Sequence, residues 1–391
     1  MRYHFVGIGG ISMSALAAIL HTRGHTVSGS DLTANDQTRM LEGLGIKVHI
    51  GHAHGNVGPA DFVVINGAID ESNPELGAGV PLVQRERLLA EIESTYKTRI
   101  AVAGTHGKST TTAMIYAILA EAQLDPTVHN GAVLHLHDGT KSNFVIGKGD
   151  IFLTEACEFK RSFLSLSPTI AVITNIDFDH ADCYKDLDAV KAAFNKFAAR
   201  AETVVRTETC PQVAVKLRIP GAHNLENARA AAQVGRILGV KENIIRTALE
   251  NFRGIDRRFQ TVSKVNSCDI ISDYAHHPTE IATTIQTAQS LYKKFLLVFQ
   301  PHTYTRTIAL FGDFVKVLTS CNCVLFKTYA AREKPISGGR AQDLAAAAGV
   351  QCIETSTALN SFLKGSFCKY DAIILTGAGD MQSILLKNFL N

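Results

Sequence analysis

A glycine, a lysine and a hydroxyl stand side by side in the segment AVAGTHGKSTTTAMI, residues 101–115. An apolar, strand-like run precedes Gly104, and a helix-like run follows Gly107-Lys108-Ser109. In phosphate-binding loops, backbone N–H groups hold phosphate oxygens, the lysine neutralises the β- and γ-phosphates, and the hydroxyl ligates Mg²⁺. The helix that follows adds the positive end of its dipole. The segment therefore predicts a compact phosphate loop. It lacks one glycine of the longer GxxxxGK[ST] pattern, where Val102 stands, and a plain strand-to-helix turn with a surface lysine is the alternative.

A second glycine cluster, Gly7-Ile8-Gly9-Gly10, follows the strand-like N-terminus. A full dinucleotide fingerprint would place another glycine at position 12, which is Ser12 here. Asp31 ends the next strand candidate, where an acidic residue can meet a ribose. Because a bare glycine cluster is often only a tight turn between a strand and a helix, nucleotide binding and a plain turn both remain open at this loop.

Acidic residues follow two further strand candidates. Glu155 and Glu158 come at and after the end of IFLTEA, and Asp177, Asp179 and His180 follow the strand in TNIDFDH. In open parallel sheets ligands bind at the carboxyl ends of the strands, and Mg²⁺ prefers a few carboxylates together with phosphate oxygens and water. Solvated loop residues are the alternative interpretation. Their place beside a phosphate loop favours Glu155 and His180 as metal ligands.

Composition excludes several classes of protein. The chain has 391 residues, of which 46% are hydrophobic and 19% charged, and this is typical of a globular protein. A formal net charge of +3 without a basic run gives no support for a nucleic-acid surface. The apolar N-terminal run contains a glycine cluster, lacks a cleavage site and is too short to span a bilayer, so we expect a cytoplasmic protein with no membrane partner.

Strand and helix patterns alternate along the whole chain and predict three α/β domains with mainly parallel sheets. The domains are expected at residues 1–95, 96–253 and 254–391. In the first, helix-like segments are expected between all strands. In the second, residues 221–250 predict two helices that break near Gly239. The remaining strand candidates are NFVIGKGD, IFLTEA, TIAVITNID, CDIISDY, FLLVFQP, NCVLFKT and DAIILTG.

Eight motifs in this order resemble one family, the Mur ligases, which are ATP-dependent amide ligases of peptidoglycan synthesis. They are GIGGISMSALAAIL with SGSD, GTHGKSTTT, TNIDFDHADCY, GAHNLENA, GIDRRFQ, DYAHHPTEIA, FQPHTYTRT and YAAREKPISGG. The resemblance covers almost the whole chain and is greatest to members that join L-alanine to UDP-N-acetylmuramate. It implies a Rossmann-like N-terminal domain that binds the UDP-sugar, a central P-loop ATPase-like domain, and a Rossmann-like C-terminal domain that closes over ATP and the amino acid.

The resemblance also implies roles for individual residues. Lys108, His180 and His276 would be catalytic. Mg²⁺ would be held by Ser109, Glu155 and His180. The UDP-sugar and the reacting groups would be bound by Gly9, Gly10, Asp31, His302 and Arg306. ATP would be bound by Gly104, Thr105, His106, Gly107, Lys108, Ser109, Thr110, Asn224, Arg257, Arg258 and Asp273.

The implied reaction activates a carboxylate as an acyl phosphate, which the amine of L-alanine then attacks. The expected partners are these small molecules alone, with no nucleic acid, and the protein is expected to be a monomer or a homodimer. Two alternatives are a ligase that attaches a recycled peptide to the same sugar, and a non-catalytic paralogue that binds the nucleotide or UDP-sugar. A nicotinamide dehydrogenase would leave Lys108 and the third domain unexplained.

Several positions depart from the family pattern. Cys157 and Lys160 replace polar or acidic residues after Glu155, and Asn66-Gly67 replaces serines. Thr303 stands where the family commonly has arginine, which would weaken the positioning of a substrate carboxylate. The segment between Tyr184 and Gly221 is shorter than in the family. Some members use a carbamylated lysine, and no lysine of this chain is assigned to that role.

Overall fold

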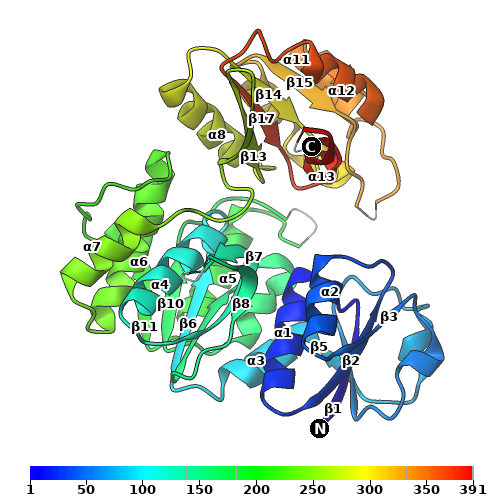
Figure 1. The fold of residues 1–391 in the computed structure, drawn as a ribbon, viewed down its shortest axis with the longest axis vertical. Coiled ribbons are helices and arrows are strands. Elements are labelled where there is room, and N and C mark those ends of the chain that lie inside the picture. The colour runs from blue at the N-terminus through cyan, green and yellow to red at the C-terminus, as the bar shows by residue number, and fades with distance from the viewer. Residues whose placement is uncertain (137–138, 181–182, 332, 390–391) are drawn as a thin grey trace. The chain divides into compact units, whose positions relative to one another are not determined.

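The computed structural model describes residues 1–136, 139–180, 183–331 and 333–389, which form three sheets with their helices (Figure 1). The chain divides into two compact units. The first unit comprises residues 1–176, 191–215 and 227–251 and contains two of the sheets. The second unit comprises residues 177–190, 216–226 and 252–391 and contains the third.

The first sheet is parallel throughout, in the order β3-β2-β1-β4-β5. Its strands are β1 (Arg2–Val6), β2 (Thr26–Asp31), β3 (Lys47–Ile50), β4 (Phe62–Ile65) and β5 (Leu82–Gln84). Its helices are α1 (Ile11–Thr22), α2 (Asp36–Gly43) and α3 (Arg85–Glu93). The expectation of helices between all strands was wrong, because only the short 3₁₀ turns η1 (His54–Asn56) and η2 (Pro74–Gly77) lie between β3, β4 and β5. Both segments contain glycine, and η2 also begins with proline, which shortens helical runs.

The second sheet has the order β11-β10-β6-β9-β7-β8, with β7 and β8 antiparallel and the other pairs parallel. Its strands are β6 (Thr98–Ala103), β7 (Thr127–His135), β8 (Lys141–Val145), β9 (Ile151–Glu155), β10 (Ile170–Ile173) and β11 (Thr203–Arg206). Its helices are α4 (Lys108–Glu121), α5 (Leu187–Ala198), α6 (Ala222–Ile237) and α7 (Glu242–Asn251). The last two confirm the expected break near Gly239. By their residue numbers, α5 and α6 each contribute to both compact units.

The two sheets of the first unit are joined through α1, which packs against β7 and β8 (Figure 1). The Asn143 side chain in β8 donates a hydrogen bond to the Ile11 carbonyl at the start of α1, with an N–O distance of 2.6 Å. Helix α3 packs against the 3₁₀ segment η3 (Phe159–Ser165). The glycine cluster that precedes α1 therefore lies next to a contact between the two sheets.

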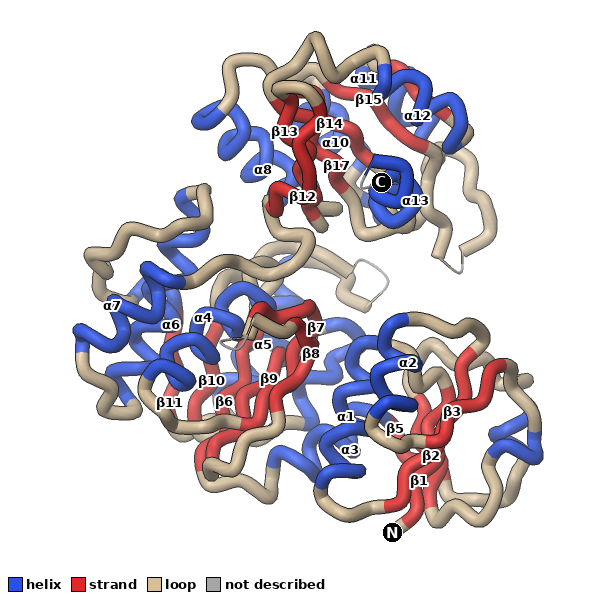
Figure 2. Tube along the Cα trace, in the orientation of Figure 1, coloured by secondary structure: helices blue, strands red, loops and turns tan. Residues whose placement is uncertain are grey.

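The third sheet has the order β12-β13-β17-β14-β15-β16, and only the β12–β13 pair is antiparallel. Its strands are β12 (Gln260–Val265), β13 (Cys268–Asp273), β14 (Phe295–Phe299), β15 (Cys323–Phe326), β16 (Gln351–Ile353) and β17 (Ala372–Thr376). Its helices are α8 (Pro278–Leu291), α9 (Tyr304–Ala309), α10 (Phe311–Leu318), α11 (Ala341–Ala348), α12 (Ser356–Lys364) and α13 (Met381–Phe389). Figure 2 shows the strands in red with helices in blue on either side.

The residues of β14 show why this sheet is covered on both faces. All five are apolar and buried. Phe295, Leu297 and Phe299 belong to one core cluster with residues of α8, α10 and α11, whereas Leu296 and Val298 belong to another with residues of α12 and α13. Successive side chains of a strand point to opposite faces, so a continuous apolar run requires cover on both sides. Among the described residues, no helix combines the length and apolar character needed to cross a membrane.

Candidate active site

The phosphate loop between β6 and α4 has a backbone that requires its two glycines. Gly104 has φ +145°, and a Cβ added to it would lie 1.8 Å from the Thr174 Oγ1 atom. Gly107 has φ +81°, and its added Cβ would lie 2.5 Å from the Asn227 Oδ1 atom. Positive φ at these values is unfavourable for residues with side chains. The glycines thus allow both the left-handed backbone and close contact with neighbouring polar side chains.

The residues that directly follow β10 form hydrogen bonds with the phosphate loop. The Asn175 side chain accepts from the His106 N–H at 2.9 Å and donates to the His106 carbonyl at 3.0 Å. The Asn175 carbonyl accepts from the Thr105 N–H, and the Thr174 hydroxyl donates to the His106 carbonyl at 2.6 Å. The loop is therefore fixed in shape by protein contacts alone, and Thr110 is buried just beyond it in the first turn of α4.

Lys108 has an acidic partner in the next strand-to-loop segment of the sheet. Its ammonium lies 3.0 Å from a carboxylate oxygen of Glu158 and donates to the Thr105 carbonyl at 3.0 Å. Burial alone would lower the pKa of Lys108, but the charges of Glu158 and Glu155 outweigh it and raise that pKa above its ordinary value. Lys108 is therefore a fixed cation at any working pH. The sequence placed Glu158 near the loop without identifying it as the partner of the lysine.

Ser109 and Glu155, two of the three predicted metal ligands, are in contact. The Ser109 hydroxyl donates to the Glu155 Oε2 atom at 2.8 Å, and the Gly131 N–H donates to the same oxygen at 2.9 Å. A hydroxyl and a carboxylate at the mouth of a phosphate loop are oxygen ligands of the kind that Mg²⁺ takes. The donor set fits the ion, so this part of the predicted metal site is supported by geometry.

The first glycine loop is held by its own sheet. The Gly9 N–H donates to the Asp31 Oδ2 atom at 2.9 Å, and the Asn35 side chain donates to the Gly9 carbonyl at 3.2 Å. A Cβ at Gly9 would lie 2.7 Å from Asn35 and 2.9 Å from Asp31. Gly10 caps α1 in an extended conformation. The structure thus brings Gly9, Gly10 and Asp31 together, and it shows that Asp31 holds the loop itself.

Two departures from the family pattern meet in space within the first unit. The Lys160 ammonium, in the left-handed backbone of η3, donates to the Gly67 carbonyl at 3.4 Å. A Cβ at Gly67 would come within 3.0 Å of that ammonium. A serine at position 67 would crowd the lysine, so the two substitutions are compatible with each other.

In the second unit, Arg306 forms a clamp on Asp179. Its Nε and Nη2 atoms donate to the two carboxylate oxygens at 3.2 and 3.4 Å, and its Nη1 atom lies 3.2 Å from the His302 Nδ1 atom. Burial would raise the pKa of Asp179, but Arg306 and His180 hold it well below its usual range. His180 has φ +55°, and its Nε2 atom lies 3.8 Å from Asp179. Asp179 thus gathers three of the predicted residues around it.

His276 joins this cluster from the loop before α8. Its ring lies 5.8 Å from the His302 ring, centroid to centroid, and its Nδ1 atom is 2.9 Å from the Tyr274 carbonyl. Burial lowers the pKa of His276 to about 3 and the pKa of His302 to about 4, with Arg306 adding to the effect in both. Both rings are therefore neutral at pH 7, and each can accept a hydrogen bond.

Three predicted ATP contacts in the second unit are engaged with protein groups. Arg257 donates to the Gln382 side chain and to the Gly377 carbonyl, both at 2.8 Å. Asp273 accepts from the Phe259 and Ala275 N–H groups at 2.8 and 2.7 Å. Arg258 lies 3.6 Å from Glu280, from the Arg258 Nη1 atom to the Glu280 carboxylate. The roles of all three at ATP stay predictions, and these contacts make Arg258 the better candidate of the two arginines.

Asn224, another predicted ATP contact, donates to the Pro220 carbonyl at 2.6 Å in the second unit. Asn227 of the same motif approaches Gly107 and accepts from the Thr111 hydroxyl at 3.2 Å in the first unit. Sequence reasoning missed Asn227, although the motif GAHNLENA contains it. The asparagine that touches the phosphate loop is thus the second of the motif, one helical turn beyond the first.

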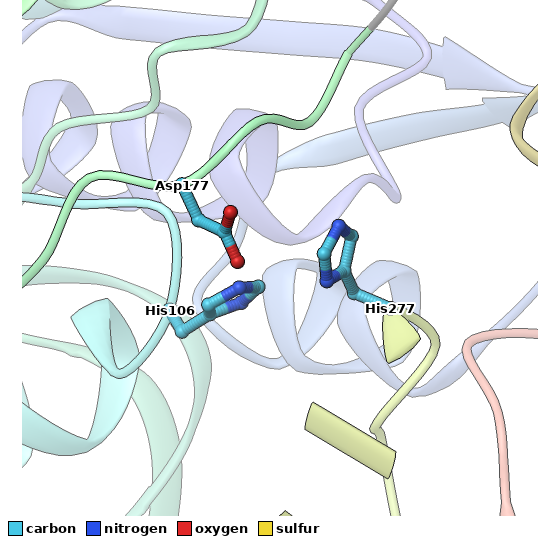
Figure 3. Close-up of side chains that lie close together, drawn as sticks. All are labelled: His106, Asp177 and His277. Carbon is cyan, nitrogen blue, oxygen red and sulfur yellow. The ribbon is translucent and has the colours of Figure 1, made fainter. Parts of the chain in front are cut away.

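Figure 3 labels His106 of the phosphate loop, and it labels Asp177 and His277 of the second unit. Within that unit the Asp177 Oδ2 atom accepts from the Thr279 hydroxyl at 2.8 Å, and the His277 Nε2 atom lies 3.1 Å from the Phe178 carbonyl. A carboxylate oxygen of Asp177 and a ring nitrogen of His277 lie within 4.8 Å of each other. His277, which was not selected from the sequence, therefore fixes the segment that also carries Asp179 and His180.

Comparisons with known proteins agree with this arrangement. Residues 2–97 match the model described as "Mur ligase family, catalytic domain", residues 102–206 match "Mur ligase middle domain", and residues 257–379 match "Mur ligase, glutamate ligase domain". The UDP-N-acetylmuramate–L-alanine ligase of Agathobacter rectalis is 39% identical, over 98% of this chain and 96% of that protein. That alignment spans 446 positions, more than the 391 residues of this chain, so the relative carries segments that are absent here.

Solved structures give the same result for the fold. The crystal structure of the UDP-N-acetylmuramate–alanine ligase of Thermotoga maritima has a TM-score of 0.83 at 28% identity, covering 100% of this chain and 98% of that one. A murein peptide ligase of Psychrobacter arcticus has a TM-score of 0.75 at 22% identity, covering 100% and 99%, and shows the fold alone. With the phosphate loop, its acidic partners and matches along nearly its full length, the chain belongs to the Mur ligase family.

Proposed function

We propose that the protein is an ATP-dependent ligase that joins L-alanine to the carboxylate of UDP-N-acetylmuramate, in the synthesis of peptidoglycan precursors. The observation that carries the proposal is the phosphate loop, in which Lys108 contacts Glu158 and Ser109 contacts Glu155, in a chain 39% identical over 98% of its length to a ligase of that name. The domains at 1–95, 96–253 and 254–391 would bind the UDP-sugar, ATP and the amino acid.

The reaction needs an activated carboxylate, because a free carboxylate is a poor electrophile. The carboxylate oxygen attacks the γ-phosphorus of ATP, the bond to the bridging oxygen breaks, and ADP leaves. The alanine nitrogen then attacks the carbonyl carbon of the acyl phosphate, phosphate leaves, and the nitrogen loses a proton. Lys108, held charged beside Glu158, would neutralise the charge that develops on the transferring group.

Ser109 and Glu155 would hold Mg²⁺, which neutralises phosphate charge and orients the phosphates when bound. The Gly131 N–H fixes the orientation of Glu155 towards Ser109. Gly104 and Gly107 keep the backbone of the loop open to phosphate oxygens. In the second unit, His276, His302 and Arg306 would receive the amino acid and the reacting carboxylate, and His180 would hold a Mg²⁺ ion near that carboxylate. Burial keeps His276 neutral, so its ring would accept a hydrogen bond from the incoming amine.

Phosphate release tests the proposal directly. Purified protein with ATP, Mg²⁺ and UDP-N-acetylmuramate should release phosphate only when L-alanine is added. Lys108→Ala should abolish release, and Lys148→Ala, a change at an exposed lysine, should not. Release with a tripeptide but not with alanine would assign the recycled-peptide reaction instead. Binding of ATP and the UDP-sugar without any release would identify a non-catalytic protein. Since ATP and UDP-sugars are cytoplasmic metabolites, the proposed reaction places the protein in the cytoplasm.

A further inference from the structure

One buried histidine links the two sheets of the first unit and belongs to no predicted site. His129, in β7, is 3% exposed. Its Nε2 atom lies 2.8 Å from the hydroxyl of Ser12, in the first turn of α1. Its Nδ1 atom lies 2.9 Å from the hydroxyl of Thr154, in β9. Both ring nitrogens are therefore hydrogen-bonded, one to helix α1 of the first sheet's domain and one to strand β9 of the second sheet.

The neighbouring donors determine the direction of these hydrogen bonds. The Arg85 Nη1 atom donates to the Ser12 hydroxyl oxygen at 3.3 Å, which leaves the Ser12 proton for the His129 Nε2 atom. The Thr154 hydroxyl donates to the Glu155 carbonyl at 3.1 Å, so its oxygen accepts from the His129 Nδ1–H. A neutral imidazole has one donor nitrogen and one acceptor nitrogen, as this series of hydrogen bonds requires. Burial, with a smaller effect of Arg85, lowers the pKa of His129 to about 3 and keeps the ring neutral.

The same strand pair contacts both partners a second time. Two residues after His129, the Gly131 N–H donates to the Glu155 carboxylate at 2.9 Å. In the paired strand, the Asn143 side chain donates to the Ile11 carbonyl at 2.6 Å. Ile11 and Ser12 directly follow the Gly9-Gly10 loop. Strands β7 and β8 thus contact the start of α1, directly after the first glycine loop, and they also contact Glu155.

We propose that His129 is a positioning residue that fixes the first glycine loop relative to Glu155 through the hydrogen bonds from Arg85 to the Glu155 carbonyl. The inference rests on the proposed function, in which the sugar bound at the first loop carries the carboxylate that must reach the γ-phosphate beside Glu155. A misplacement of about 1 Å between reacting groups can cost about 10²-fold in rate. His129 therefore acts on the chemical step and not on the binding of either nucleotide.

The test compares His129→Leu and Ser12→Ala with His54→Leu, a change at an exposed histidine outside both loops. Both test variants should lower kcat by about 10- to 100-fold while the Kd values for ATP and UDP-N-acetylmuramate change by less than about threefold. His129→Gln, which keeps one donor and one acceptor, should recover part of kcat. Ser12→Ala removes the same hydrogen bond without changing the buried ring, so it decides the matter if His129→Leu fails to fold.

Unchanged kcat in Ser12→Ala and His129→Leu would overturn the proposal. So would a loss of kcat matched by equal losses in both Kd values, since that describes general damage to the fold. Hydrogen exchange separates this inference from the proposed function. Faster exchange of residues 7–14 and 129–135 in both test variants, but not in His54→Leu, would establish the link even if the wild-type protein released no phosphate. Unchanged exchange in an inactive protein would overturn both.

Discussion

The two glycine loops of the first unit occupy equivalent places and differ in their chemistry. Each loop follows a central strand of its sheet, β1 or β6, and each precedes a helix, α1 or α4. The loop before α1 carries no charged side chain, and its Gly9 N–H already meets Asp31. The loop before α4 carries Lys108 and Ser109, which contact Glu158 and Glu155. Similar backbones therefore present different chemical groups.

Glycine spacing thus shapes a loop, whereas its side chains determine its chemical use. The first loop offers backbone N–H groups and a helix N-terminus, which suit the binding of a diphosphate that does not react. The second adds a fixed cation and oxygen ligands for a metal, which suit the transfer of a phosphoryl group. The first loop instead is attached to the second sheet through Ser12 and His129.

The largest effect is expected at Lys108. Lys108→Ala removes the cation of the second loop and the ion pair that this cation forms with Glu158, which is 2% exposed. We expect kcat for phosphate release to fall by about 10³-fold, since the lost charge stabilises the transferring group. Steady-state assays beside Lys148→Ala check this. An activity within about tenfold of wild type would mean that the second loop resembles the first in chemistry.

Glu155 tests the metal side of the second loop. Glu155→Gln keeps the shape of the side chain but removes the charge that Ser109 and Gly131 contact. Activity at fixed Mg²⁺ should fall by about 10²-fold, and higher Mg²⁺ should recover part of it. A Mg²⁺ titration of wild type and variant measures the shift. Equal Mg²⁺ requirements in the two proteins would remove Glu155 from the metal site.

The sequence predicted those parts of the molecule that depend on local spacing. The strand, the GTHGKS segment and the helix coincide at β6 and α4, and the break between α6 and α7 lies at Gly239 as expected. The placement of Glu155 next to Ser109 also followed, because carboxyl ends of adjacent parallel strands meet at one edge of the sheet. These features need only the order and period of residues along the chain.

The features that were missed depend on contacts between distant residues. Strand β7 has a polar centre, His129-Asn130-Gly131, so its pattern does not indicate a strand, and its partner groups Ser12 and Thr154 lie far away in the sequence. Arg257, whose role at ATP stays a prediction, also contacts groups more than 100 residues further along the chain, which its motif did not indicate. Spacing within a motif carries no information about such partners.

Glycine-to-alanine substitutions should lower the free energy of unfolding more in the second loop than in the first. Gly104→Ala places a side chain at φ +145° and 1.8 Å from Thr174, which should lower the free energy of unfolding by about 3 kcal/mol. Gly10 has φ −68°, and a Cβ added to it would have no neighbour closer than 3.4 Å. Gly10→Ala should therefore lower the free energy of unfolding by less than about 1 kcal/mol. Chemical denaturation of both variants gives the comparison. Equal losses would mean that the second loop can rearrange around a side chain.

Acid should lower the stability of the whole fold through His129, whereas the Lys108 contact stays intact. The pKa of His129 is about 3 in the fold, below the ordinary histidine value, so between these two pH values only the unfolded chain takes up the proton. Stability is therefore lost as pH falls below about 6.5, and by pH 5 one such histidine contributes a loss of about 2 kcal/mol. Denaturation of wild type and His129→Gln at pH 7 and pH 5 should show a loss smaller by that amount in the variant. The same pH dependence in both proteins would assign the acid sensitivity to other buried histidines.

The smallest effect is expected at Asp31, the acidic residue of the first loop. Asp31→Asn preserves the size of the side chain and replaces a charged acceptor for the Gly9 N–H with a neutral one. Hydrogen bonds to charged groups stabilise by about 1 kcal/mol more than neutral ones, so the KM for UDP-N-acetylmuramate should rise by about fivefold. The KM for ATP and kcat should stay near those of Asp36→Asn, a change at an exposed aspartate nearby. A change confined to the KM for UDP-N-acetylmuramate would show that the first loop binds its ligand through a backbone shaped by Asp31. An effect on kcat would mean that this loop also takes part in the chemical step.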